Sequence, residues 1–236
     1  MAERVAIGGV GAVGGGRRLP FLQLVGIPLN VLLFLLLMIM AWGSWKGFFA
    51  HPVRVGVVVV HLIMMPVMTF CTGGRSRGVK HVHDWKPFFP LLMFHSLFTA
   101  WVMPYMDARD ILTLPGGDVL RWTGFAFLAA GAALRIWPML ALGSRFASVV
   151  AIQEGHRLRT DGIYAMARHP SYLGIILLDL GFAGVFRSTV ALFLMPMVFW
   201  MFKRRMDVEE SLLVEGFGDE YRAYMKRTPR LLPGVY

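Results

Sequence analysis

Long apolar stretches constrain the fold of this chain more than any other feature of its sequence. Four of them approach the roughly 20 apolar residues that a helix needs to cross a bilayer. They cover approximately residues 19–43, 53–72, 87–106 and 119–143. A fifth apolar region is too long for one span and is interrupted at Arg187, so we divide it into helices over about 171–186 and 189–205. The sequence therefore predicts an all-α integral membrane protein with about six helical segments, five of them spans and the last a shorter partner in a C-terminal helical hairpin.

Composition excludes other classes of protein. Hydrophobic residues make up 56% of the chain and charged residues 16%, and the mean hydropathy is +0.59. Soluble domains carry about 45–50% apolar and about 25% charged residues, so a soluble domain and a disordered chain are both excluded. The single cysteine, Cys71, cannot form an intramolecular disulfide or a zinc site, and no metal is expected.

The charge balance is strongly basic, with 24 Lys and Arg against 14 Asp and Glu and a formal charge of +10. No basic helix or aromatic RNA-binding motif accompanies this charge, so we expect no nucleic-acid partner. Membrane proteins instead concentrate Lys and Arg in their cytoplasmic loops. Because the hairpin returns the chain to the side on which it started, 18 of the 24 basic residues fall on the side of the two termini and five on the other. This bias predicts that both termini are cytoplasmic.

The chain divides into three parts. Residues 1–18 are rich in glycine and are expected to form a flexible tail. Residues 19–118 hold the first membrane helices, and residues 119–236 hold the polar motifs. We therefore look for the chemistry in the third part.

The longest polar segment, 144–170, ends at His169-Pro170. Proline biases the preceding residue away from helix and suits the first turn of the next one. Loops of this length are usually functional or disordered, and apolar anchors such as Ile152 and Tyr164 argue against disorder. His169 is therefore either a helix-start residue at the interface or a contact for a ligand.

A second polar segment follows the last apolar stretch. Its Arg205 and Glu209 are four residues apart and so share one helix face. They form either a surface ion pair, worth about 0.3–0.5 kcal/mol, or two opposite charges held beside a cavity for an anionic and a cationic ligand group. Arg135 and Asp179 lie inside predicted spans, where an ionisable side chain is a functional candidate unless it is paired or reaches the boundary.

Together, these motifs resemble the isoprenylcysteine carboxyl methyltransferase family, and related phospholipid methyltransferases share much of the pattern. The resemblance covers about residues 124–236, and the order and spacing of the motifs make it specific. The motifs are Leu134-Arg135, Gly143-Ser144, Gln153-Glu154-Gly155-His156, Arg168-His169-Pro170-Ser171-Tyr172-Leu173-Gly174, Glu209-Glu210, Phe217-Gly218-Asp219-Glu220-Tyr221 and Arg227-Thr228-Pro229-Arg230-Leu231-Leu232-Pro233.

The resemblance implies that residues 119–236 are a methyltransferase core with S-adenosylmethionine as the methyl donor. The cofactor pocket would be cytoplasmic, closed by the 144–170 loop and the last helix. By position, Arg205 is the catalytic residue that faces the acceptor, and Glu209 meets the cofactor. The other cofactor-binding residues implied in this way are Gln153, His156, Arg157, Leu158, Arg159, Tyr164, His169, Pro170, Ser171 and Tyr172.

The expected function is methyl transfer to a lipophilic acceptor, either a small molecule or a lipid-linked group. An isoprenylcysteine-like carboxylate is the first choice, because a carboxylate needs no general base and Arg205 can hold it bidentately. The alternatives are a phospholipid amine, or a small apolar thiol or amine. A membrane reductase and a transporter fit less well, since the sequence has no convincing nicotinamide motif and no visible internal repeat. Membrane lipid is an expected partner, and the residues indicate no particular oligomeric state.

Overall fold

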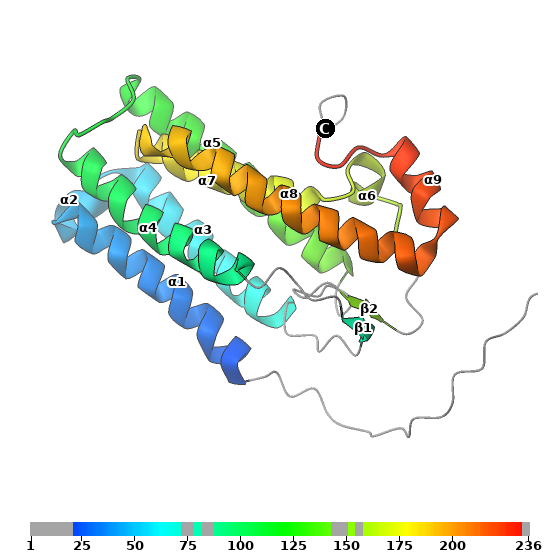
Figure 1. The fold of residues 1–236 in the computed structure, drawn as a ribbon. Coiled ribbons are helices and arrows are strands. Elements are labelled where there is room, and N and C mark those ends of the chain that lie inside the picture. Colours follow the sequence, from blue (N-terminus) through cyan, green and yellow to red (C-terminus); the bar gives the residue numbers. More distant parts are fainter. Residues whose placement is uncertain (1–20, 72–77, 82–86, 143–150, 154–157, 233–236) are drawn as a thin grey trace, which may run out of the picture.

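The computed structural model is a bundle of long helices that run side by side (Figure 1). It describes residues 21–71, 78–81, 87–142, 151–153 and 158–232, so the predicted tail lies outside the described residues. The helices are α1 (Phe21–Trp42), α2 (Trp45–Phe49), α3 (Pro52–Cys71), α4 (Phe88–Ala108), α5 (Gly117–Leu142), α6 (Ile163–Met166), α7 (Pro170–Val185), α8 (Val190–Phe217) and α9 (Asp219–Arg227).

Four of the described helices, α1, α3, α4 and α5, are long and apolar enough to cross a membrane. On α1, one stripe of large apolar side chains is more than half exposed, and it consists of Leu29, Leu32, Leu36 and Met40. Apolar side chains that point outward along a whole helix suit contact with lipid tails rather than with water. The chain is therefore a multi-pass integral membrane protein, as its sequence predicts.

The helical hairpin is confirmed, with α8 longer than predicted. The apolar region breaks between Val185 and Val190, where the Arg187 backbone has a φ of 44°. The predicted span ends near residue 205 and the predicted helix near Glu210, but α8 continues to Phe217. The residues beyond the apolar part still favour a helix, and the next residue with a positive φ is Gly218, at 56°. α7 has 16 residues, fewer than an ordinary span needs.

The prediction of an all-α fold was also incomplete. A short two-stranded antiparallel sheet pairs β1 (Gly78–His81) with β2 (Ala151–Gln153). It joins two segments that lie at least 70 residues apart in the sequence, on either side of α4 and α5. Neither strand has the length or alternation that would have indicated it.

Glycines bring α5 and α7 into backbone contact. A Cβ atom on Gly181 would lie 2.3 Å from the Leu128 backbone nitrogen, and one on Gly131 would lie 2.6 Å from the Leu178 backbone nitrogen. Real Cβ atoms essentially never approach this closely. Small residues at helix contacts are a general device in membranes, where close packing replaces the hydrophobic effect as the force between helices. This contact sets the position of α7 against α5, and therefore the position of the site at the start of α7.

A buried ion cluster closes the opposite end of the bundle. The Asp107 side chain, at the end of α4, is fully buried and accepts hydrogen bonds of 2.6 and 2.9 Å from Arg121 on α5. Arg187, between α7 and α8, donates to the same carboxylate at 2.8 Å. The cluster ties α4, α5 and the hairpin turn together, and removing one charge from such a cluster leaves another uncompensated.

Candidate active site

Three segments that are distant in sequence meet at the other end of the bundle. They are the start of α7, the second half of α8, and residues 228–232, which we call the C-terminal strap. The Arg168 and His169 backbone N–H groups each donate at 2.9 Å to strap carbonyls, those of Pro229 and Arg230. Gly218 allows the chain to turn from α8 into α9, which lies beside α6 and leads into the strap (Figure 1).

Tyr172 lies at the centre of the predicted residues. Its hydroxyl donates to Glu209 Oε2 at 2.8 Å and accepts from Arg205 Nε at 3.1 Å. Its ring stacks on the His169 ring, with centroids 5.5 Å apart, and packs against Phe202 at the same distance. Arg205 and Glu209 thus share a helix face, as the sequence predicts, and the Tyr172 hydroxyl links them.

Behind Tyr172, His169 is buried between two carboxylates of α8. Its Nε2 lies 3.0 Å from Glu210 Oε1, and its Nδ1 lies 3.8 Å from Glu209 Oε2. The His169 backbone, with φ of −125° and ψ of 57°, is non-helical, and Pro170 begins α7. The helix start expected from the His-Pro pair is confirmed, and the His169 imidazole turns toward α8. A ligand contact by His169 remains a prediction.

Glu210 is surrounded by cationic and hydrogen-bond-donating groups. Arg230 of the strap donates to its Oε2 from Nε at 2.9 Å, and Arg168 Nε lies 3.3 Å from Oε1. Burial alone would raise the pKa of this carboxyl, but the bonds from His169 and Arg230 and the charge of Arg168 hold the pKa below its usual range. Glu210 is therefore an ionised, acceptor-only group inside the folded protein.

Arg205 faces the apolar interior from α8 and is 5% exposed. Its guanidinium carbon lies 4.6 Å from the ring centroid of Phe88 and 5.3 Å from that of Phe89, both at the start of α4. Such distances allow cation–π attraction. A positive group is thereby held where the apolar core, formed here by Phe88, Phe202 and their neighbours, meets the polar end of the site.

The remaining predicted residues at this end have separate partners. Ser171 accepts a hydrogen bond from Arg135, the arginine inside α5, which brings α5 to the site. The Tyr164 carbonyl accepts a 2.5 Å hydrogen bond from the Tyr224 hydroxyl of α9. Burial raises the pKa of the Tyr164 phenol above its usual value and that of Tyr224 to about 12, so both are neutral hydrogen-bonding groups.

The structure does not bring every predicted cofactor residue to the site. Arg159 pairs locally with Asp161 at 3.1 Å on the surface, and Leu158 is half-buried beside it. His156 and Arg157 lie outside the described residues, and of Gln153 the backbone is described as part of β2. Their roles as cofactor ligands remain predictions. Among the described residues, no group of three His, Cys, Asp or Glu could hold a metal ion.

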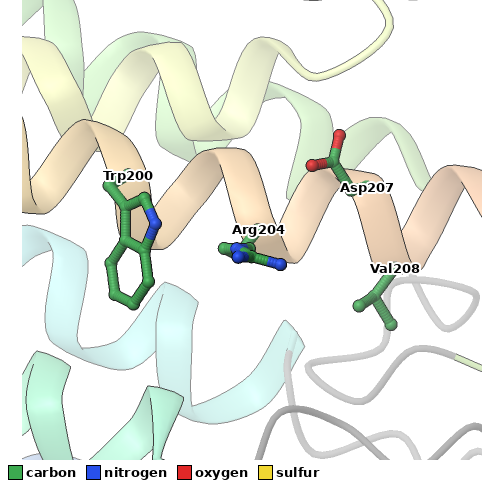
Figure 2. A pocket seen from close by; sticks show the side chains of 4 residues that line it. All are labelled: Trp200, Arg204, Asp207 and Val208. Carbon is green, nitrogen blue, oxygen red and sulfur yellow. The ribbon is translucent and has the colours of Figure 1, made fainter.

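A cavity of about 340 Å³ opens along the outer face of α8. Its described lining consists of Trp200, Arg204, Asp207 and Val208, of which Trp200 and Val208 point to the same side of the helix and Asp207 to the other (Figure 2). In the part of the chain that the structure describes, none of the predicted cofactor residues lines it. Arg204 therefore differs from its neighbour Arg205, which faces the Tyr172 hydroxyl.

Sequence reasoning named the Glu209-Glu210 and Arg227–Pro233 motifs but assigned no role to Glu210 or Arg230. The aromatic support from Phe88 was also missed. The spacing of three residues between Asp207 and Glu210 was a usable signal, because it predicts two carboxylates on one face of a helix. The contacts of Arg230 and Phe88 depend on how α9 and α4 pack, and no local pattern indicates them.

Comparison with known proteins identifies related sequences. The model of the isoprenylcysteine carboxyl methyltransferase (ICMT) family matches residues 122–215. A protein-S-isoprenylcysteine O-methyltransferase of Schizosaccharomyces pombe is 38% identical over 119 residues, which are 49% of this chain and 50% of that protein. The corresponding protein of Homo sapiens is 36% identical over 119 residues, 49% of this chain and 42% of that protein. The chain thus spans about half the length of these curated relatives.

Two further matches cover a larger share of the protein that is compared with this chain. A solved structure of the eukaryotic intramembrane Ras methyltransferase ICMT has 20% sequence identity and a TM-score of 0.45, over 88% of this chain and 86% of the other. Protein-S-isoprenylcysteine O-methyltransferase B of Arabidopsis thaliana is 30% identical over 132 residues, 53% of this chain and 67% of that protein. Because this chain is 30% identical to the plant protein and covers two thirds of its length, the chain belongs to the isoprenylcysteine carboxyl methyltransferase family.

Proposed function

We propose that this protein is an S-adenosylmethionine-dependent membrane methyltransferase whose acceptor is a lipophilic carboxylate of the isoprenylcysteine type. One observation carries the proposal: the Tyr172 hydroxyl joins Arg205 to Glu209, so that a cationic and an anionic side chain lie side by side at the edge of an apolar core. The names of the relatives, protein-S-isoprenylcysteine O-methyltransferase, support the same assignment.

The side chains present suit the donor. Glu209 is 32% exposed and keeps acceptor capacity beyond its bond from Tyr172, which suits the donor's ammonium group. The stacked Tyr172 and His169 rings form an aromatic wall beside Glu209, and aromatic rings suit a cationic sulfonium. When bound, S-adenosylmethionine supplies an electrophilic methyl group on a sulfonium, which a carboxylate oxygen accepts with its own electron pair and without a general base.

Arg205 suits the acceptor. A guanidinium binds a carboxylate through two parallel N–H donors, and the Phe88 and Phe89 rings restrict where this one can point. An ammonium acceptor would be repelled at this position and would have to lose a proton first. This favours a carboxylate over a phospholipid amine.

The site acts by alignment and by exclusion of water. His169, Arg205 and Glu210 are each no more than 5% exposed, although all three are polar or charged. Charges in a water-poor site interact more strongly than in solution, and fixed partners lower the cost of orienting reactants. No described residue is needed to remove a proton during the transfer.

The membrane setting suggests that the methyl donor and the acceptor reach the site by different routes. We place both termini, α9 and the strap in the cytoplasm, because the predicted topology puts most of the basic residues on that side of the membrane. The water-soluble donor then arrives from the cytoplasm, and the lipophilic acceptor arrives between helices from the bilayer. In this arrangement α7 and the apolar part of α8 complete the membrane region as a short hairpin.

Calorimetric titration of detergent-solubilised protein with S-adenosylhomocysteine tests the donor site. Wild type is expected to bind saturably, and Glu209→Ala to lose most of the affinity. The matched control, Glu220→Ala, removes an exposed carboxylate of α9 and should bind like wild type. No binding by folded wild-type protein would refute the proposal.

Transfer of radiolabelled methyl to a prenylated cysteine carboxylate tests the acceptor side. Arg205→Ala should abolish turnover while donor binding survives. Arg204→Ala removes the neighbouring, exposed arginine and should leave turnover close to wild type. Full activity in Arg205→Ala would show that this residue does not hold the acceptor.

A further inference from the structure

Arg230 connects the C-terminal strap to two carboxylates on α8. Its Nη1 donates to Asp207 Oδ1 at 2.7 Å, while Nε and Nη2 donate to Glu210 Oε2 at 2.9 and 2.5 Å. Asp207 and Glu210 are three residues apart, and so lie on one face of α8. A guanidinium carries several N–H groups in a fixed plane, so a single side chain can bridge both carboxylates, which the one nitrogen of a lysine cannot do in the same geometry.

Arg230 affects the site through its hydrogen bonds to Glu210. An ionised carboxylate can accept but not donate hydrogen bonds, so the 3.0 Å contact with His169 requires the proton on Nε2. With the proton on Nε2, the nitrogen that lacks a proton in the neutral form of the ring is Nδ1, which lies 3.8 Å from Glu209 Oε2. Glu210 thus selects the His169 tautomer, and Arg230 holds Glu210 in place.

We propose that Arg230 is a positioning residue of the active site, which fixes the His169 tautomer and ring orientation through Glu210 and fastens the C-terminal strap across the start of α7. This rests on the proposed function, because His169 is taken to face the methyl donor. In this proposal Arg230 acts through Glu210 and His169. Its backbone carbonyl, which accepts from the His169 N–H at 2.9 Å, gives the strap a second hold on the same residue.

The first test measures the His169 tautomer directly in the wild-type protein. In ¹⁵N-histidine NMR of the detergent-solubilised full chain, assigned by His169→Asn, neutral His169 should show the Nε2–H tautomer. The Nδ1–H tautomer would overturn the proposal. The NMR measurement requires no ligand. Its result can therefore be interpreted even if the binding assays contradict the proposed function.

The second test compares Arg230→Gln, Arg230→Lys and, as a matched control, Arg227→Gln, which removes an exposed arginine from the end of α9. S-adenosylhomocysteine affinity is measured across pH. The charged and titratable groups around Glu210 are His169, Arg168 and Arg230 from the other segments, Asp207 and Glu209 on α8, and Tyr221 and Tyr224 on α9. Of these groups, the comparison changes Arg230 alone.

Removing a cation this close raises a carboxyl pKa by about 1 unit or more. We expect the affinity for S-adenosylhomocysteine to fall at acidic pH, which defines the acidic limb of the pH profile. In Arg230→Gln this limb should move to higher pH by about that amount. Arg230→Lys should recover most of this shift, and Arg227→Gln should overlay wild type. A merely structural role lowers the melting temperature without moving the limb, so an unmoved limb in folded Arg230→Gln overturns the proposal, as does an equal shift in Arg230→Lys.

Discussion

Replacing Tyr172 by phenylalanine isolates the hydroxyl that organises the site. The variant keeps the ring that stacks on His169 and packs on Phe202, and removes one oxygen that bonds both Glu209 and Arg205. Hydrogen bonds to charged groups are worth about 1.5–3 kcal/mol each. Since Arg205 and Glu209 share a helix face and can move toward each other, we expect the loss to stay near the value for one bond.

This energy corresponds to a fall of about 10- to 100-fold in kcat/KM, at about 1.4 kcal/mol for each factor of ten. The assay is transfer of radiolabelled methyl to a prenylated cysteine carboxylate in detergent, with the melting temperature followed in parallel. Melting should change by no more than a few degrees, because the packed ring is retained. Tyr105→Phe, at the far end of α4, removes a hydroxyl outside the site and should be silent.

The reasoning would be refuted by a Tyr172→Phe protein that keeps more than half of the wild-type kcat/KM. It would also be refuted if activity fell only in proportion to a loss of folded protein. A selective rise in KM for the acceptor would assign the hydroxyl chiefly to Arg205. A selective loss of donor affinity would assign it to Glu209.

Three further predictions concern stability, each measured by thermal unfolding in detergent. Gly181→Leu should prevent α7 from packing on the Leu128 backbone and abolish the cooperative transition, whereas Gly26→Leu, where a Cβ meets nothing within 4 Å, should be tolerated. Asp107→Ala should lower stability by about 3–5 kcal/mol, because it strands buried cations, and a change under 1 kcal/mol would contradict this. Since the pKa of Glu210 is lowered by folding, its stabilising contribution is present above the usual glutamate pKa and is lost as the pH falls through the lowered value. Glu210→Gln should flatten this acid dependence, and an unchanged pH profile would exclude Glu210 as its source.

The membrane helices could be predicted because a local property decides them. Each needs about 20 apolar residues in a row, and this is visible without knowledge of any partner. The same holds for the start of α7 at Pro170, for the break at Arg187 and for the shared face of Arg205 and Glu209. Each of these follows from the stereochemistry of a few neighbouring residues.

The rest of the site could not be read from local patterns. The sheet between β1 and β2 pairs strands of four and three residues, too short to show a period. The length of α8 was underestimated because apolar character marks the lipid-facing part of a helix and not its end. Glu210 was visible as a residue, but its burial depends on His169 and Arg230 arriving from other segments.

The sequence by itself determined that the chain is an integral membrane protein. It also determined which residues carry charge and which motifs the chain shares with a methyltransferase family. Only the tertiary structure decided that Tyr172 links Arg205 to Glu209, and that Arg230 reaches Glu210 after the chain turns at Gly218. The physical reason is one of range. Hydrophobicity, helix periodicity and proline stereochemistry act over a few residues, whereas a hydrogen bond between distant segments depends on the close α5–α7 contact and on the path of α9, which set the distances between them.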